Sequence, residues 1–222
     1  HVRSRRQRQM CIRDSPTPML ISIEGIDGAG KNTLVSTIRE SLDRPVEVIA
    51  FPRYAESIHA QLAQKALYGK MGDLTDSAYA MATLFALDRY GVKDQLQRAK
   101  GTDAVVLLDR YVASNAAYSA ARLEDDAVMD WVHDLEFGTL GLPQADLQVY
   151  LDTAVEVASE RAQARAQADA NRERDRYERD GGLQERTAAA YRRLADAGWG
   201  GRWIATADAD TIISAIKDLV GE

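Results

Sequence analysis

Cysteine is almost absent from this sequence of 222 residues. The single cysteine, Cys11, excludes a disulfide bond within the chain, and we therefore expect the reducing environment of the cytoplasm. Long apolar runs are also missing, since no stretch approaches the roughly 20 residues that a membrane helix needs. His59 and His133 have no cysteine or second histidine at metal-ligand spacing. These absences argue against a membrane partner and against a zinc site.

Basic side chains are in the minority, and they are unevenly distributed. The chain has 28 lysines and arginines against 34 acidic residues, which gives a formal net charge of -6. Residues 1–18 hold five of these arginines and one aspartate, so the rest of the chain carries -10. Such an acidic body argues against nucleic-acid binding. We expect residues 1–18 to be a non-native or disordered extension, and residues 19–222 to form one domain that starts at Met19.

Residues 20–33, with the sequence LISIEGIDGAGKNT, combine a strand-like apolar run, a glycine-rich loop and the start of a helix. Gly25, Gly28 and Gly30 allow the backbone to wrap closely around a polyphosphate. The loop N–H groups and the positive end of the helix then point at the anion. Lys31 adds a mobile positive charge for the outer phosphates. This order predicts a phosphate-binding loop.

The residue after this lysine departs from the usual motif. Asn32 stands where a serine or threonine hydroxyl normally binds Mg²⁺. The amide oxygen of Asn32, the neighbouring Thr33 or carboxylates elsewhere in the chain are the alternatives for this metal. Asn32 also leaves open a catalytically inactive P-loop protein. A GTP-driven switch is a further alternative, but it would need a guanine-reading Asn-Lys-x-Asp run, which the sequence lacks.

Apolar runs and helical periodicity alternate along the rest of the chain. Further strands are predicted at 46–51, 104–108, 147–151 and 203–205. Helices are predicted at 33–42, 56–68, from Thr75 or Asp76 to Ala99, and at 111–121, 124–137, 183–197 and 211–220. The alternation predicts an α/β domain with a mainly parallel sheet and helices on both faces. Ligands then bind where the strands end, at Gly25, Phe51, Asp109 and Asp152.

Polar residues follow the buried strand at 104–108. Asp109 can hold Mg²⁺ or its waters, and Arg110 can bind a phosphate bidentately. Ser114, Asn115 and Tyr118 come next at helical spacing, so we expect them to face the same cleft. A surface ion pair at the end of a strand is the structural alternative for Asp109 and Arg110.

Phe85 and Arg89 lie four residues apart in the predicted helix that ends at Ala99, and therefore share one face. An aromatic ring beside a planar guanidinium suits a nucleobase, since the ring can stack and the guanidinium can donate to an exocyclic oxygen. Ordinary core packing of Phe85 is the alternative.

Residues 161–180 are rich in charge, with arginines interleaved with Asp175 and Glu178. The arginines are Arg161, Arg165, Arg172, Arg174, Arg176 and Arg179. Phosphoryl transfer needs positive charge, and the loop has no basic residue between Gly25 and Gly30. We therefore predict that residues 161–180 form a mobile lid, although a solvated helix with surface ion pairs is the alternative.

The chain resembles thymidylate kinases, and specifically the mycobacterial members of that family. The resemblance runs from Met19 nearly to the C-terminus. It rests on the stretches EGIDGAGK, FPRY, YAMATLFALDR, LLDRYVASNAAYSAAR, LEFGTLGLP and YERD. It implies a three-layer P-loop fold like that of nucleoside monophosphate kinases, with a mainly parallel five-stranded sheet. It also implies a homodimer that transfers the γ-phosphate of ATP to dTMP, with Mg²⁺, to give dTDP. The alternative is another P-loop kinase that acts on thymidine or dCMP.

The resemblance also implies roles around the acceptor nucleotide. Phe85 is expected to stack on thymine, Arg89 to donate to its O4, and Asn115 to meet the other polar edge of the base. Tyr118 is expected to close the space beside the 2′ position of the sugar. The other substrate-binding residues are expected to be Asp27, Phe51, Tyr54, Arg110, Ser114, Asp175 and Tyr177, with Arg110 and Tyr54 on the phosphate and Asp27 near the 3′-hydroxyl.

The remaining implied roles concern ATP, the metal and catalysis. ATP is expected to bind at Gly25, Gly28, Ala29, Gly30, Lys31, Asn32, Thr33 and Arg161. The residues expected to act in catalysis are Lys31, Arg110, Arg165, Arg172 and Asp27. The metal candidates are Asp27, Asp109 and Glu178. Because Ile26, Asp27 and Ala29 leave the loop without a basic residue, the chain resembles the members that supply catalytic arginine from the lid.

Overall fold

The computed structural model describes residues 19–99, 104–168 and 175–222. The predicted extension, residues 1–18, lies outside these ranges. Within them, the strands form one parallel sheet in the order β2-β3-β1-β4-β5, which confirms the predicted five-stranded sheet. The strands are β1 (Met19–Glu24), β2 (Val46–Ala50), β3 (Val105–Asp109), β4 (Leu147–Tyr150) and β5 (Trp203–Ala205).

The central strand β1 is buried from Leu20 to Glu24, with parallel neighbours on both sides. Its register pairs Ile23 with Asp109 of β3, and Glu24 with Tyr150 of β4. Because all the strands run in one direction, the segments that follow β1, β2, β3 and β4 meet at one edge of the sheet. This edge therefore collects the glycine loop and the polar residues that follow β3.

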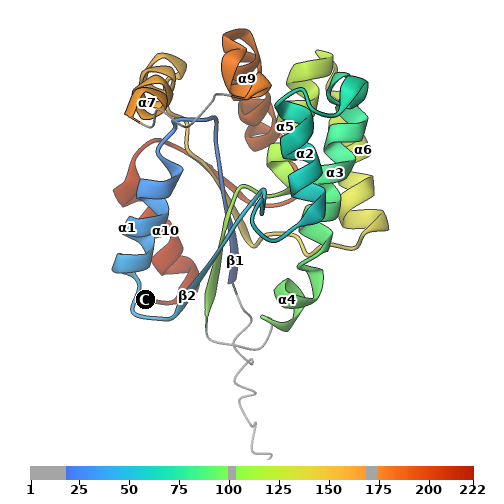
Figure 1. Ribbon diagram of the computed structural model, residues 1–222. Coiled ribbons are helices and arrows are strands. Elements are labelled where there is room, and N and C mark those ends of the chain that lie inside the picture. Colours follow the sequence, from blue (N-terminus) through green and yellow to red (C-terminus); the bar gives the residue numbers. More distant parts are fainter. Residues whose placement is uncertain (1–18, 100–103, 169–174) are drawn as a thin grey trace, which may run out of the picture.

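Helices cover both faces of the sheet, as predicted (Figure 1). Helices α1 (Lys31–Ser41) and α10 (Ala209–Val220) pack together on one face. Helix α9 (Gly181–Asp196) packs against α5 and β4. The other face is covered by α2 (Ile58–Leu67), α3 (Ala78–Tyr90), α5 (Val112–Leu123) and α6 (Ala127–His133). The remaining elements are η1 (Gly72–Asp76), α4 (Lys93–Arg98), η2 (Asp134–Thr139), α7 (Val155–Ala168) and α8 (Arg176–Arg179).

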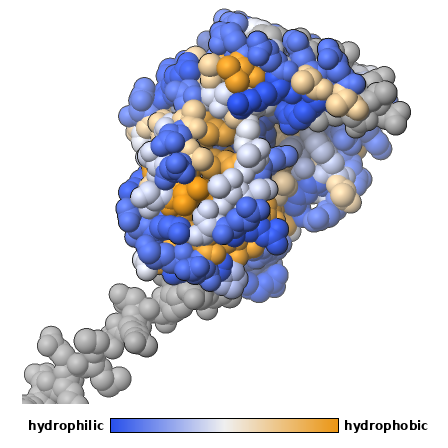
Figure 2. All heavy atoms as spheres, turned by 90° about the vertical axis from the view of Figure 1, so that its left-hand side faces the viewer, coloured by the Kyte–Doolittle hydropathy of each residue, from blue (hydrophilic) through white to orange (hydrophobic). Residues whose placement is uncertain are grey.

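The face that carries α1 and α10 is largely hydrophilic, with hydrophobic residues visible at its centre (Figure 2). The apolar sides of these two helices bury Leu34, Ile38, Ile212 and Ile216. This is the pattern of amphipathic helices that pack on a sheet. Across the described ranges, the structure contains no helix of the length and apolarity required to cross a lipid bilayer.

The single long helix predicted from Thr75 or Asp76 to Ala99 is wrong. Ser77 caps α3, with its Oγ accepting a hydrogen bond from the N–H of Ala80, and α3 ends at Tyr90. Arg53 Nη2 donates to the carbonyl oxygen of Asp88 at 2.8 Å, in place of the N–H of Val92 that a continuous helix would use. The Val92 N–H bonds instead to the oxygen of Arg89, and the chain restarts as α4.

The helix predicted at 124–137 also differs from the structure. Glu124 has a φ of 52° and ends α5 in a left-handed conformation, so α6 begins only at Ala127. After His133 the chain continues as η2, a π-helix that contains the buried residue Glu136. Short π-helical turns are rare and occur often at functional sites.

Candidate active site

The glycine loop connects β1 to α1, as the sequence predicts. Gly30 precedes α1 in a left-handed conformation, with a φ of 102°. Lys31 is buried, and its Nζ donates to the carbonyl oxygens of Gly25 at 3.2 Å and Ile26 at 3.0 Å. Burial, together with the positive charge of Arg110, lowers the pKa of Lys31 to about 8. The loop thus holds its own lysine through two of its carbonyl oxygens.

Helix α7 lies directly on this loop. A Cβ placed on Gly28 would be 1.9 Å from the carbonyl oxygen of Ala158 in α7, so only glycine allows this approach. Arg161 of the same helix reaches the loop as well, since its Nη1 would be 3.5 Å from a Cβ on Gly30. Thr153 Oγ1, just before α7, donates to the oxygen of Ala29 at 2.8 Å. The predicted lid therefore begins in contact with the phosphate-binding loop.

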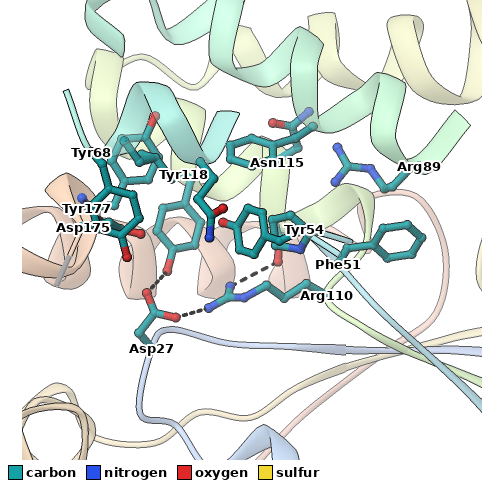
Figure 3. Close-up of a pocket in the computed structure, with 15 residues that line it drawn as sticks. Asp27, Phe51, Tyr54, Tyr68, Arg89, Arg110, Asn115, Tyr118, Asp175 and Tyr177 are labelled. Atoms are coloured by element: carbon teal, nitrogen blue, oxygen red, sulfur yellow. Dashed lines mark hydrogen bonds and ion pairs between the residues drawn. The ribbon is translucent and has the colours of Figure 1, made fainter. Parts of the chain in front are cut away.

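A cavity of about 460 Å³ opens beside this loop, at the carboxyl edge of the sheet. It is lined by every residue that we expected to bind the acceptor nucleotide, drawn from the segments that follow β1, β2 and β3, from α3 and α5, and from the segment around α8 (Figure 3). Pro52, Gln64, Leu67 and Tyr68 also line it and were not predicted. The convergence of residues this far apart in sequence makes the cavity the candidate substrate site.

Arg110 lies at the centre of the polar side of this cavity. Its Nη2 forms an ion pair with Asp27 Oδ1 at 2.5 Å, and Tyr118 donates to the other oxygen of Asp27 at 3.3 Å (Figure 3). Burial opposes ionisation of Asp27, but the charges of Arg110 and Lys31 prevail and lower its pKa. Arg110 has a φ of 66°, a left-handed conformation that costs a residue with a side chain roughly 1–3 kcal/mol.

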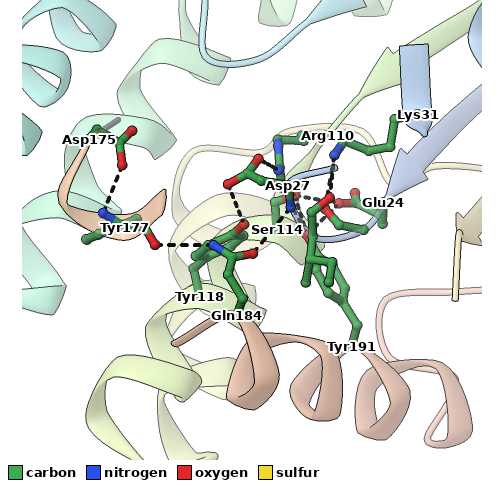
Figure 4. Close-up of polar contacts among 12 residues, drawn as sticks. Glu24, Asp27, Lys31, Arg110, Ser114, Tyr118, Asp175, Tyr177, Gln184 and Tyr191 are labelled. Atoms are coloured by element: carbon green, nitrogen blue, oxygen red, sulfur yellow. Dashed lines mark hydrogen bonds and ion pairs between the residues drawn. The ribbon is translucent and has the colours of Figure 1, made fainter. Parts of the chain in front are cut away.

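Glu24, the last residue of β1, was not predicted as part of the site. It is fully buried and accepts hydrogen bonds from the Tyr111 N–H at 2.9 Å and from Ser114 Oγ at 2.6 Å. The hydroxyl of Tyr191 in α9 forms hydrogen bonds with Ser114 and Glu24, and it accepts one from Arg110 Nη1 (Figure 4). Burial raises the pKa of Glu24, and its hydrogen bonds offset part of that rise. The signal in the sequence was a carboxylate at the end of a mainly apolar, buried strand.

The far end of the cavity holds the predicted base-binding residues. Phe85 and Arg89 both line it from α3, as their spacing predicts, and Asn115 lines it from α5. Arg89 and Asn115 are joined by Glu136, which accepts from Arg89 at 2.5 and 2.6 Å and from Asn115 at 2.8 Å. Sequence reasoning did not identify Glu136, although it lies within the LEFGTLGLP stretch.

The predicted lid reaches the cavity through Asp175 and Tyr177. The Tyr177 ring stacks on that of Tyr118, with centroids 6.0 Å apart, and its N–H donates to Asp175 Oδ1 at 2.8 Å. Arg122 of α5, which was not predicted, donates to the Tyr177 hydroxyl at 2.5 Å. Arg165 is exposed on α7. The predicted roles of Arg172 and of the Glu178 side chain fall outside what the structure describes.

Acidic side chains next to the loop are the candidates for a metal. No cluster of three or more histidine, cysteine, aspartate or glutamate residues occurs in the described ranges. Asp109 Oδ1 is buried and has no hydrogen-bond partner among the described residues, and Asp27 stands close to both Arg110 and Lys31. Mg²⁺ commonly takes only one or two protein carboxylates, with the rest of its ligands from phosphates and water. Asp109 fits that requirement with its unpartnered oxygen, and Asp27 fits it once a metal replaces Arg110 or Tyr118 at one of its oxygens.

Comparison with known proteins agrees with this geometry. The family model for thymidylate kinase matches residues 23–218. The thymidylate kinase of Mycobacterium tuberculosis is 54% identical over 200 residues, covering 86% of this chain and 93% of the relative. That of Paraburkholderia phytofirmans is 33% identical over 183 residues, covering 79% and 83%.

A solved structure shares the fold. A thymidylate kinase from Candida albicans superposes with a TM-score of 0.70, at 22% sequence identity, and the match covers 92% of each chain. At that identity the likeness supports the architecture alone. The match of the family model over most of the chain, together with the identity to the mycobacterial relative, shows that this chain belongs to the thymidylate kinase family.

Proposed function

We propose that the protein transfers the γ-phosphate of ATP to the phosphate of dTMP, giving dTDP and ADP. The observation that carries the proposal is a cavity in which Arg110 stands between the phosphate-binding loop and the pair Arg89 and Asn115. A base at the far end and a phosphate at Arg110 would direct the acceptor oxygen toward Lys31. The family to which the chain belongs supports the same reaction.

The acceptor phosphate is held, in this proposal, by Arg110 and Tyr54. Arg110 has donors to spare beyond its ion pair with Asp27, and a guanidinium can bind a phosphate with two parallel hydrogen bonds. Burial raises the pKa of Tyr54, so that its hydroxyl stays neutral and can donate. No strong general base is needed, since the attacking phosphate oxygen already carries negative charge.

The donor triphosphate lies on the loop that follows β1. Its phosphates take the loop N–H groups and the Nζ of Lys31, which now bonds to the carbonyl oxygens of Gly25 and Ile26. Arg161 is the cation of α7 nearest to this loop. Asp27 and Asp109 would hold Mg²⁺, which neutralises charge on the phosphate oxygens when it is bound. The protein otherwise positions the two phosphates for in-line attack.

Two further features belong to the proposal, a homodimer and a cytoplasmic location. Tyr79 of α3 is 45% exposed and contacts Trp131 of α6 edge to face, which offers an aromatic surface to a second copy. Sedimentation at several protein concentrations tests the dimer, and a monomer at all of them would refute it.

Turnover of a panel of nucleoside monophosphates with ATP and Mg²⁺ tests the proposed reaction. We expect dTMP to be the best acceptor and thymidine to be inactive, because thymidine would leave Arg110 and Tyr54 without a phosphate. Turnover of thymidine in preference to dTMP would instead establish a nucleoside kinase. No turnover of any acceptor would establish the inactive P-loop protein that Asn32 suggests.

A further inference from the structure

Glu136 is a buried carboxylate with no part in the reaction described above. Its exposed fraction is 0%, and it lies in the π-helix η2. Its Oε2 accepts from Arg89 Nε at 2.5 Å, while its Oε1 accepts from Arg89 Nη2 at 2.6 Å and from Asn115 Nδ2 at 2.8 Å. An ionised carboxylate can only accept hydrogen bonds, so it dictates which atoms its partners turn toward it.

For Arg89, the consequence is that one group remains for the cavity. Nε and Nη2 are taken by Glu136, whereas Nη1 has no hydrogen-bond partner among the described residues, and Arg89 lines the cavity. Burial alone would lower the pKa of Arg89, but the Glu136 carboxylate outweighs it and raises the pKa. Arg89 therefore offers the cavity a donor, and never an acceptor.

For Asn115, the consequence is a fixed orientation of the amide. Its Nδ2 donates to Glu136 at 2.8 Å and to the carbonyl oxygen of Ala82 at 2.9 Å. Both partners are acceptors, so turning the amide over would place Oδ1 against two oxygen atoms. Among the described residues Oδ1 has no hydrogen-bond partner, and Asn115 lines the cavity. Asn115 therefore offers the cavity an acceptor.

A donor beside an acceptor matches only one kind of pyrimidine edge. Thymine and uracil present an acceptor at O4 and a donor at N3, whereas cytosine presents a donor at N4 and an acceptor at N3. We propose that Glu136 is a positioning residue that makes the cavity select a 4-oxo pyrimidine over a 4-amino pyrimidine, by fixing the groups that Arg89 and Asn115 present. This inference rests on the proposed dTMP kinase function and names a residue that controls its acceptor.

Replacing Glu136 by glutamine keeps the shape of the side chain but gives it a donor. The amide introduced by Glu136→Gln can then donate to the Oδ1 of a reversed Asn115, whose Nδ2 is free to meet the N3 of cytosine. The oxygen of Ala82 still opposes this reversal, and Arg89 still presents a donor to the N4 amino group of cytosine, so the selectivity is weakened and not lost. Sites that pair buried polar groups reject a mismatched substrate by about 10⁴–10⁵-fold, and we expect Glu136→Gln to lower the rejection of dCMP at least about tenfold.

The experiment measures kcat/KM for dTMP, dUMP and dCMP, with ATP and Mg²⁺, in the full-length protein. The ratio of kcat/KM for dUMP to kcat/KM for dCMP reports the selection of a 4-oxo over a 4-amino pyrimidine, which Glu136 is proposed to control. The ratio of dTMP to dUMP is the internal control, since these two acceptors differ only in a methyl group. Asp88→Asn is the matched control variant, because Asp88 is another buried carboxylate in the same region and pairs with Arg53.

We expect the ratio of dUMP to dCMP to fall at least about tenfold in Glu136→Gln and to stay unchanged in Asp88→Asn, while the ratio of dTMP to dUMP stays constant in both. An unchanged ratio in Glu136→Gln, or an equal fall in Asp88→Asn, would overturn the inference and leave the proposed function intact. Inactivity of the wild-type protein toward both dTMP and dUMP would refute the proposed function itself.

A second variant keeps the inference testable if Glu136→Gln does not fold. The double variant Asn115→Asp with Glu136→Gln exchanges the amide and the carboxylate at nearly constant volume and charge. The introduced amide then donates to one oxygen of the introduced carboxylate, whose other oxygen still accepts from N3 of thymine or uracil. We expect the double variant to work more slowly, because the oxygen of Ala82 loses its donor, but to keep the wild-type preference for dUMP over dCMP. Loss of that preference would overturn the inference.

Discussion

Gly28→Ala tests whether the phosphate-binding loop needs its contact with helix α7. The new Cβ would stand 1.9 Å from the carbonyl oxygen of Ala158 and 2.8 Å from its carbonyl carbon. Ordinary contacts begin near 3.4 Å, so the loop and α7 must separate by roughly 1.5 Å, the difference between 3.4 and 1.9 Å. Both atoms belong to the backbone, and no side chain can turn aside to relieve the clash.

Two costs follow from this substitution. Gly28 has a φ of +84°, and placing a side chain in that left-handed conformation costs about 1–2 kcal/mol. Each kcal/mol lowers the melting temperature of a protein of this size by about 2–4 °C. The displacement of the loop acts on activity instead, because a shift of about 1 Å in a catalytic group can cost about 10²-fold. We therefore expect kcat/KM for ATP to fall about 10²-fold.

Gly198→Ala is the matched control for strain without a clash. Gly198 has a φ of +62°, and its nearest neighbour is the oxygen of Gly201 at an ordinary 3.7 Å. We expect this variant to lose a similar amount of thermal stability and to keep the wild-type kcat/KM for ATP. Calorimetry and steady-state kinetics on both variants check the comparison. Equal ATP kinetics in the two variants would refute the reasoning, since strain alone would then explain Gly28.

Three further predictions concern Lys31 and Tyr118. Lys31→Ala should lower kcat at least about 10²-fold in steady-state assays, the scale of one lost donor to the transition state, and near-normal turnover would refute that role. Because the pKa of Lys31 is lowered to about 8, its ammonium is charged below that pH and neutral above it, so kcat/KM for ATP should fall as the pH rises through about 8. In Lys31→Arg the side chain stays charged, so kcat/KM for ATP should no longer fall as the pH rises through about 8, even if the activity is lower throughout. If this variant keeps the fall, another group is responsible for it. Tyr118→Ala should weaken discrimination between dTMP and its ribonucleotide analogue, measured as the ratio of their kcat/KM values, and an unchanged ratio would exclude Tyr118 from that selection.

The sequence was sufficient to predict the sheet and most of the cavity. A continuous apolar run such as residues 105–108 has few alternatives to a buried strand, and parallel strands bring their carboxyl ends to one edge. Residues that follow those ends, such as Arg110, must therefore lie near the glycine loop. Helical spacing then placed Phe85 with Arg89, and Asn115 with Tyr118, because positions three or four apart share a face.

Contacts between distant parts of the chain account for what could not be predicted. Arg53 ends α3 by donating a hydrogen bond to the carbonyl oxygen of Asp88, and the periodicity of α3 does not predict that bond. Glu136 lies 47 residues from Arg89, and its place depends on a π-helical turn that has no clear sequence signal. Local pattern fixes which faces are apolar, but it does not say which polar groups become partners.

The distribution of the cavity over the sheet is uneven, and this has a practical consequence. The residues that line it come from the segments that follow β1, β2 and β3 and from nearby helices, whereas no described residue from Trp203 to Val220, in β5 and α10, takes part. These two elements are therefore separate from the lining of this cavity. A fluorescent label on the outer side of α10 would therefore report on unfolding, and an affinity handle there would immobilise the protein. Neither would alter the choice of acceptor.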